Sequence, residues 1–189
     1  MTRTNGRWLR CVAAGFLLVM SHPVHAFDAA ELQQSLHAAQ PSEVRYEETR
    51  ESPWLAAPVT TRGILKATPD LLEKRVEWPR AEIWRLREDK AEWVGSGGSK
   101  QISYEKAPAL QILADVSRRA IAGDLHELAR DFTIKVSGTA DTWMARLQPH
   151  TPAVMRLIDS VELQGTGSTL RVLIVVERQG ERTTTRLAP

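Results

Sequence analysis

The stretch VTTRGILKATPDLLEKRVEWPRAEIWRLR, residues 59–87, decides the fold class of this chain. It divides into three segments rich in β-branched, leucine and tryptophan residues: Val59–Lys66, Leu71–Trp78 and Glu82–Arg87. Short proline-containing segments separate them, and this composition predicts strands that follow one another as hairpins. We therefore expect an antiparallel sheet around this stretch.

The same pattern continues on both sides of the stretch. Further strands are predicted at Val44–Thr49, Glu92–Val94, Gln101–Tyr104, Phe132–Val136, Trp143–Leu147, Val161–Leu163, Leu170–Glu177 and Thr183–Leu187. Helical spacing predicts a helix at Pro108–Ala122, and the capping-box pair Asp28 and Glu31 predicts a helix that opens the domain. Strands and helices do not alternate, so the sequence predicts an α+β fold whose strands, about 9–11 of them, form an antiparallel sheet.

The first 26 residues have the three parts of a secretory signal peptide. Three arginines precede the apolar run Cys11–Met20, and Val24 and Ala26 occupy the −3 and −1 positions of a cleavage site. Cleavage between Ala26 and Phe27 would export residues 27–189 as a single domain without a membrane anchor. A bacterial periplasm fits this reading best, and an uncleaved anchor is the alternative.

Composition limits the functions open to the exported chain. The single cysteine, Cys11, would leave with the signal peptide, so no internal disulfide could form. Residues 27–189 hold 22 lysines and arginines against 23 aspartates and glutamates, which gives no argument for a nucleic-acid partner.

No residue pattern predicts catalysis, a metal site or a cofactor. The histidines His37, His126 and His150 have no partner at metal-ligand spacing, and no serine lies in a nucleophile elbow. The glycine-rich run Gly95–Ser99 precedes a predicted strand instead of a helix, so it lacks the helix N-terminus that binds phosphate. The sequence therefore predicts a protein that is not an enzyme.

The tryptophans leave two interpretations open. Leu72, Val76 and Trp78 share one face of a predicted strand, and Trp84 and Leu86 share a face of the next. Such residues form a packed core, or they line a cavity where an antiparallel sheet curls around an apolar ligand. The sequence alone does not separate a core from a cavity.

The order of these elements resembles the LolA-like outer-membrane lipoprotein carrier family, within a divergent branch. The resemblance rests on Val44–Glu48, Gly63–Lys66 with the turn that follows, the turn region Glu82–Val94, the helix Pro108–Ala122, and Trp143–Pro149. It implies an incomplete antiparallel barrel, a curved sheet of about 9–11 strands whose concave face is covered by helices.

The resemblance also implies a function and a site. Such a protein would shuttle acylated lipoproteins, lipids or glycolipids from an inner-membrane exporter to an outer-membrane acceptor. The residues expected to line its lipid cavity are Val44, Tyr46, Leu65, Leu72, Val76, Trp78, Trp84, Leu86, Trp93, Leu113 and Val116. The alternative is an envelope scaffold that binds a protein partner through a sheet edge.

One position departs from the family pattern. Standard carriers place an arginine, which latches the helical lid, directly before the proline that follows the second strand. Here that position is Thr68. A threonine hydroxyl makes fewer hydrogen bonds than a guanidinium, so we expect the standard latch to be absent.

Overall fold

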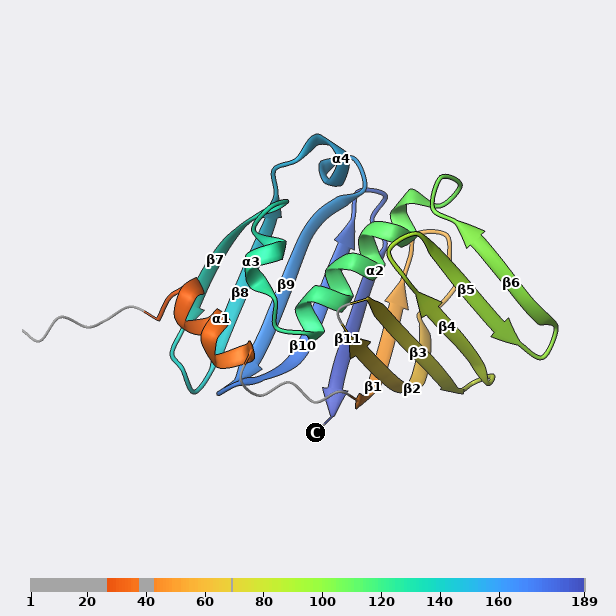
Figure 1. Ribbon diagram of the computed structural model, residues 1–189, viewed down its shortest axis with the longest axis horizontal. Coiled ribbons are helices and arrows are strands. Elements are labelled where there is room, and N and C mark those ends of the chain that lie inside the picture. The colour runs from red at the N-terminus through yellow and green to blue at the C-terminus, as the bar shows by residue number, and fades with distance from the viewer. Residues whose placement is uncertain (1–26, 38–42, 69, 189) are drawn as a thin grey trace, which may run out of the picture.

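The computed structural model describes residues 27–37, 43–68 and 70–188 (Figure 1). The predicted signal peptide lies outside these residues. Eleven strands and four helices form within the described part, and their bounds are α1 (Ala29–His37), β1 (Glu43–Glu51), β2 (Val59–Thr68), β3 (Leu71–Trp78), β4 (Glu82–Leu86), β5 (Lys90–Gly95), β6 (Gly98–Ser103), α2 (Pro108–Ile121), α3 (Leu125–Leu128), β7 (Phe132–Gly138), β8 (Trp143–Pro149), α4 (Pro152–Met155), β9 (Ile158–Thr166), β10 (Thr169–Glu177) and β11 (Arg182–Ala188). Each predicted strand and helix is present.

All the strands belong to one antiparallel sheet, in the order β6-β5-β4-β3-β2-β1-β11-β10-β9-β8-β7. The first and last of the described strands, β1 and β11, pair in the middle of the sheet, with Tyr46 opposite Leu187. The edge strands β6 and β7 lie at opposite ends of this order, so the sheet curves without closing (Figure 1). The expected incomplete antiparallel barrel is confirmed.

Two of the predicted hairpin turns are closed by backbone hydrogen bonds. The Arg87 amide donates to the Lys90 carbonyl at 2.9 Å between β4 and β5. Between β10 and β11 the Glu177 amide donates to the Glu181 carbonyl at 2.8 Å, and Gly180 adopts a φ of 84°. A positive φ is readily accessible to glycine, which explains why this turn contains one.

The opening helix has the predicted capping box. The Asp28 side chain accepts hydrogen bonds from the amides of Ala30 at 2.8 Å and Glu31 at 3.0 Å. The Glu31 carboxylate accepts the Asp28 amide in return, at 3.3 Å. The apolar face of α1 buries Leu32 and Leu36 completely. This reciprocal cap and the buried face fix the helix on the sheet.

Helix α2 joins the two edges of the sheet. It begins at Pro108, a short turn after the edge strand β6, and the chain reaches the other edge strand, β7, after α3. Gly123, with a φ of 70°, ends the helical run. Because the connection must span the sheet, α2 crosses its concave side (Figure 1). The expected helical cover is therefore α2 together with α1 and α3.

The concave face has two different halves. Beside β8 and β9 it is filled by almost completely buried side chains: Leu32, Leu36, Leu128, Leu147, Ile158, Val161 and Leu163. This half is a packed core of the kind that stabilises a domain. The other half, under α2, contains a cavity.

Among the helices of the described residues, none combines the length and the apolar character needed to cross a membrane.

Candidate functional site

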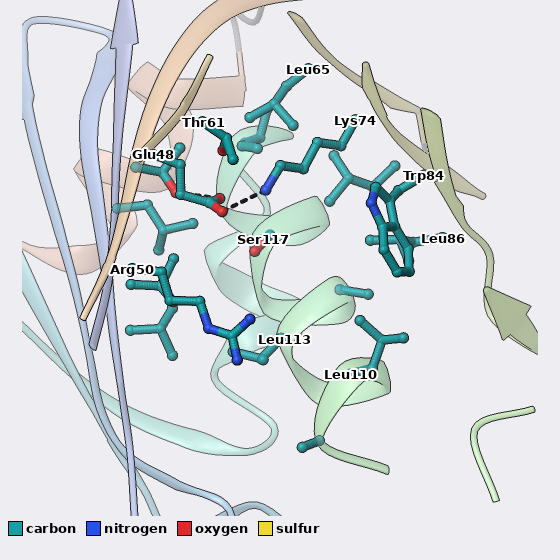
Figure 2. Close-up of a pocket in the computed structure, with 18 of the residues that line it drawn as sticks. Glu48, Arg50, Thr61, Leu65, Lys74, Trp84, Leu86, Leu110, Leu113 and Ser117 are labelled. Atoms are coloured by element: carbon teal, nitrogen blue, oxygen red, sulfur yellow. Dashed lines mark hydrogen bonds and ion pairs between the residues drawn. The ribbon is translucent and has the colours of Figure 1, made fainter. Parts of the chain in front are cut away.

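A cavity of about 490 Å³ lies between α2 and the concave face of the sheet (Figure 2). This volume falls within the range of about 300–1,000 Å³ that is typical of small-molecule sites. Its walls come from β1–β4, β10, β11 and α2, and they consist of Glu48, Arg50, Val59, Thr61, Leu65, Leu72, Lys74, Glu82, Trp84, Leu86, Ala109, Leu110, Leu113, Ala114, Ser117, Ile121, Leu173, Val175, Glu177, Glu181, Thr183 and Thr185.

Two periodicities build the apolar part of the wall. On the sheet, Leu65 of β2 and Leu86 of β4 point inward because alternate residues of a strand share a face. On α2, Leu110, Leu113 and Ser117 recur at helical spacing and form a stripe above them (Figure 2). The cavity therefore lies between a stripe of α2 and the inward face of the strands.

Five of the residues expected at a lipid cavity lie on this wall: Leu65, Leu72, Trp84, Leu86 and Leu113. Five others are placed elsewhere. Tyr46, Val76 and Val116 are each 3% exposed and do not belong to the cavity wall. Val44 packs against the core, and the half-buried Trp93 donates its indole N–H to Glu82 at 2.8 Å.

The structure corrects the placement of Trp78. Strand alternation puts it on the same face as Leu72 and Val76, but the register of β2 and β3 shifts between Arg62 and Gly63, so Val76 faces Gly63 while Trp78 faces Arg62. A shift of one residue reverses the face on which a side chain lies. Trp78 is consequently 50% exposed on the convex face, where the Arg62 guanidinium lies 5.3 Å from its ring centre.

The polar part of the wall centres on an ion pair. The Lys74 ammonium donates to Glu48 at 2.5 Å, and the second carboxylate oxygen of Glu48 accepts the Thr185 hydroxyl at 3.2 Å (Figure 2). The ammonium also lies 5.2 Å from the centre of the Tyr46 ring. Burial raises the pKa of the Tyr46 phenol, so this ring is a neutral partner of the cation.

A second ion pair lies farther along β1. Arg50 donates to both oxygens of Glu181, through Nε at 2.6 Å and through a terminal nitrogen at 3.0 Å. This fork holds the pKa of Arg50 above its ordinary value. Nearby, burial and then the Glu181 charge raise the pKa of Glu177. The site thus combines an apolar wall with carboxylates that outnumber its cations.

The polar wall and the contribution of β10 and β11 were not predicted from the sequence. Leu173 and Val175 alternate on β10, and Thr183 and Thr185 alternate on β11, so the sequence does indicate which residues share a face of each strand. What was missing is the pairing of β11 with β1, which places these residues opposite Glu48 and Arg50. No local pattern reports a pairing between the two ends of a chain.

The Thr68 hydroxyl donates to the Leu71 carbonyl at 3.4 Å, inside the hairpin between β2 and β3. This bond is local to the hairpin, and the absence of the standard latch stays a prediction. His126 and His150 lie exposed on the surface, and the side chain of His37 lies outside the described residues. Within the described ranges, no group of three or more candidate ligand side chains could hold a metal ion.

Two solved structures are similar to this chain at low sequence identity. One is a LolA superfamily protein from Nitrosomonas europaea, with 11% identity, a TM-score of 0.45, and coverage of 87% of this chain and 93% of that chain. The other is MucB in complex with MucA(peri), with 13% identity, a TM-score of 0.35, and coverage of 86% of this chain and 56% of that chain. No curated protein sequence matches this chain.

A family model gives the decisive comparison. The model described as "Outer membrane lipoprotein carrier protein LolA-like" matches residues 21–189. Proteins of this family are periplasmic, bind lipid or lipoprotein cargo and are in general not enzymes. The match covers far more than half of the chain, and it confirms the resemblance seen in the sequence. This chain, with its open antiparallel sheet and the cavity under α2, belongs to the LolA-like outer membrane lipoprotein carrier family.

Proposed function

We propose that this protein is a periplasmic carrier that holds the acyl chain of a lipoprotein or lipid in the cavity under α2. Residues 1–26 would be removed as a signal peptide, and residues 27–189 would form the carrier domain. The carrier would receive its cargo from an inner-membrane exporter and deliver it to an outer-membrane acceptor. The observation that supports this proposal is a cavity with an apolar wall in a chain of this family.

The energetics favour an acyl chain as the occupant. Each methylene transferred from water to an apolar wall contributes about 0.8 kcal/mol, so a chain of several methylenes is held without a covalent anchor. Leu65, Leu86 and Leu113 supply that wall from β2, β4 and α2. Since the walls come from a helix and from a sheet, displacement of α2 would open a path for cargo.

A sheet edge that binds a protein partner is the alternative function. The edge strand β6 is mostly exposed, but it begins with Gly98 and includes Lys100, and both residue types disfavour pairing with a further strand. The cavity therefore supports the carrier function better than the edge supports a scaffold function.

The test is the binding of a neutral fluorescent acyl-site probe, N-phenyl-1-naphthylamine, to protein purified without detergent from cells that express the full chain. Leu113→Arg places a charge on the cavity wall and is expected to abolish the rise in probe fluorescence. Leu55→Arg is the matched control, because Leu55 is 39% exposed in a loop that does not line the cavity.

Circular dichroism would verify that both variants are folded. Probe binding by wild type and by Leu55→Arg, together with loss of binding in a folded Leu113→Arg, supports the proposal. A wild-type protein that binds no probe and yields no extractable acyl compound would refute the carrier function. Equal binding by both folded variants would place the ligand outside the cavity.

A further inference from the structure

The charges of the cavity wall are unbalanced. Four carboxylates line it, from Glu48, Glu82, Glu177 and Glu181, against two cations, from Lys74 and Arg50. Charges beside an apolar wall act more strongly on a ligand than charges in open water, because the wall screens them less. The balance of these groups therefore bears on which polar group a ligand can bring into the cavity.

Both cations are already neutralised by neighbours. Lys74 is paired with Glu48 and lies against the Tyr46 ring, with 20% of its side chain exposed. Arg50 is occupied by the two-point contact with Glu181. A ligand anion would have to displace a carboxylate from one of these pairs, and the displaced carboxylate would then lie beside the anion.

Two carboxylates of the wall form no ion pair in the described ranges, although the charge of Arg50, which is bound to Glu181, also acts on Glu177. In the described ranges, no lysine or arginine lies within ion-pair distance of Glu82 or Glu177. Glu82 accepts the indole N–H groups of Trp84 at 3.0 Å and Trp93 at 2.8 Å, which are neutral donors. These bonds orient the carboxylate without cancelling its charge, and carboxylate oxygens retain further lone pairs for another donor.

We propose that the polar group of the ligand is a hydrogen-bond donor without negative charge, a hydroxyl or an amine, and that Glu82 and Glu177 select it. This inference rests on the proposed carrier function and narrows its cargo. Acyl glycerols, glycosylated lipids and acyl compounds with a free amine meet this requirement. Free fatty acids and anionic phospholipids do not, because their head would face uncompensated carboxylates.

The test compares ligands that share one acyl chain and differ in the head. Palmitate, monopalmitoylglycerol and palmitylamine would each displace N-phenyl-1-naphthylamine from the wild-type protein at monomeric concentrations, at a pH of about 8, where palmitate is ionised. We expect palmitate to bind about tenfold or more weakly than monopalmitoylglycerol, the scale of one like-charge repulsion across several ångströms. Tighter binding of the amine than of the glycerol ester would assign the donor as an amine, and the reverse order would assign a hydroxyl.

Two variants connect the discrimination to named residues. Glu82→Gln and Glu177→Gln each remove one negative charge from the wall and are expected to bring the affinity for palmitate closer to that for monopalmitoylglycerol. Glu47→Gln is the matched control: Glu47 does not line the cavity and pairs with Arg62 on the convex face at 2.6 Å. It should leave the ratio of the two affinities unchanged.

The possible outcomes are distinguishable. Equal wild-type affinities for palmitate and monopalmitoylglycerol would overturn this inference and leave the carrier function standing. A preference that survives both glutamine variants unchanged would also overturn it, since the discrimination would then not come from these carboxylates. A protein that binds neither the probe nor any of the three ligands would overturn the carrier function and this inference together.

Discussion

Replacement of Lys74 by methionine would measure how strongly the polar wall depends on its central ion pair. The change keeps the length of the side chain and removes the charge, which leaves the Glu48 carboxylate with the Thr185 hydroxyl as its remaining bond. Removing one partner of a buried ion pair costs about 3–5 kcal/mol. Because Lys74 and Glu48 are 20% and 19% exposed, we expect a smaller loss of about 2–3 kcal/mol.

This loss corresponds to a fall in melting temperature of about 4–12 °C for a domain of this size. Differential scanning calorimetry of wild type and Lys74→Met at neutral pH would measure it. The double variant Glu48→Gln/Lys74→Met should recover most of the loss, since glutamine can still accept the Thr185 hydroxyl and carries no charge. The two variants and the single Glu48→Gln complete a double-mutant cycle.

Arg146→Met provides the control. Arg146 forms a 3.3 Å cross-strand pair with Glu162 and is 74% exposed, so its loss should change the unfolding free energy by less than about 1 kcal/mol. If Lys74→Met destabilises the protein no more than Arg146→Met, the Glu48–Lys74 pair is not a structural element of the wall. If the double variant is no more stable than Lys74→Met, the unpaired Glu48 carboxylate is not the cause of the lost stability.

Two further changes test the cavity and the sheet. Burial raises the pKa of Glu177 above the ordinary glutamate value of about 4.3. Between the ordinary and the raised pKa the native state binds more protons than the unfolded state, so the free energy of unfolding falls as the pH rises. Glutamine does not titrate, so the free energy of unfolding of Glu177→Gln should rise relative to that of wild type from acidic to neutral pH. Urea unfolding at several pH values would measure this, and a difference that does not change with pH would contradict the raised pKa of Glu177. Gly63→Ala should cost more than about 2 kcal/mol, because a Cβ there would lie 1.9 Å from the Arg75 carbonyl oxygen. Gly97→Ala, whose Cβ would come no closer than 4.0 Å to the Trp93 ring, should unfold at nearly the wild-type urea concentration.

The elements of the sheet could be predicted because their signals are local. Alternation and hairpin turns report on neighbouring residues, and the capping box of Asp28 and Glu31 reports on a single helical turn. The pairing of β1 with β11 has no such signal, since it joins residues such as Glu48 and Thr185 from opposite ends of the domain. The polar wall follows from that pairing, which explains why it was missed.

The error at Trp78 has a different cause. An isolated glycine inside a strand is a known sign of a bulge, and Gly63 sits at the register shift that moves Trp78 to the convex face. The effect crosses from β2 to β3, so a reading of β3 alone could not find it.

The choice between core and cavity also lay beyond the sequence. Leu147 and Leu65 are the same residue type on strands of similar pattern, yet Leu147 is packed under helices while Leu65 faces a gap. Only the distance between α2 and the strands beneath it separates the two outcomes, and that distance depends on the packing of the whole domain.

Nuclear magnetic resonance of the methyl groups of the protein with bound monopalmitoylglycerol tests the carrier function most directly. The carrier function predicts intermolecular contacts from the acyl chain to the methyl groups of Leu65 on β2, Leu86 on β4 and Leu113 on α2. Leu147 and Leu163, in the filled half of the concave face, should show none. Contacts to that filled half, or no contacts to the three cavity leucines at saturating ligand, would contradict it.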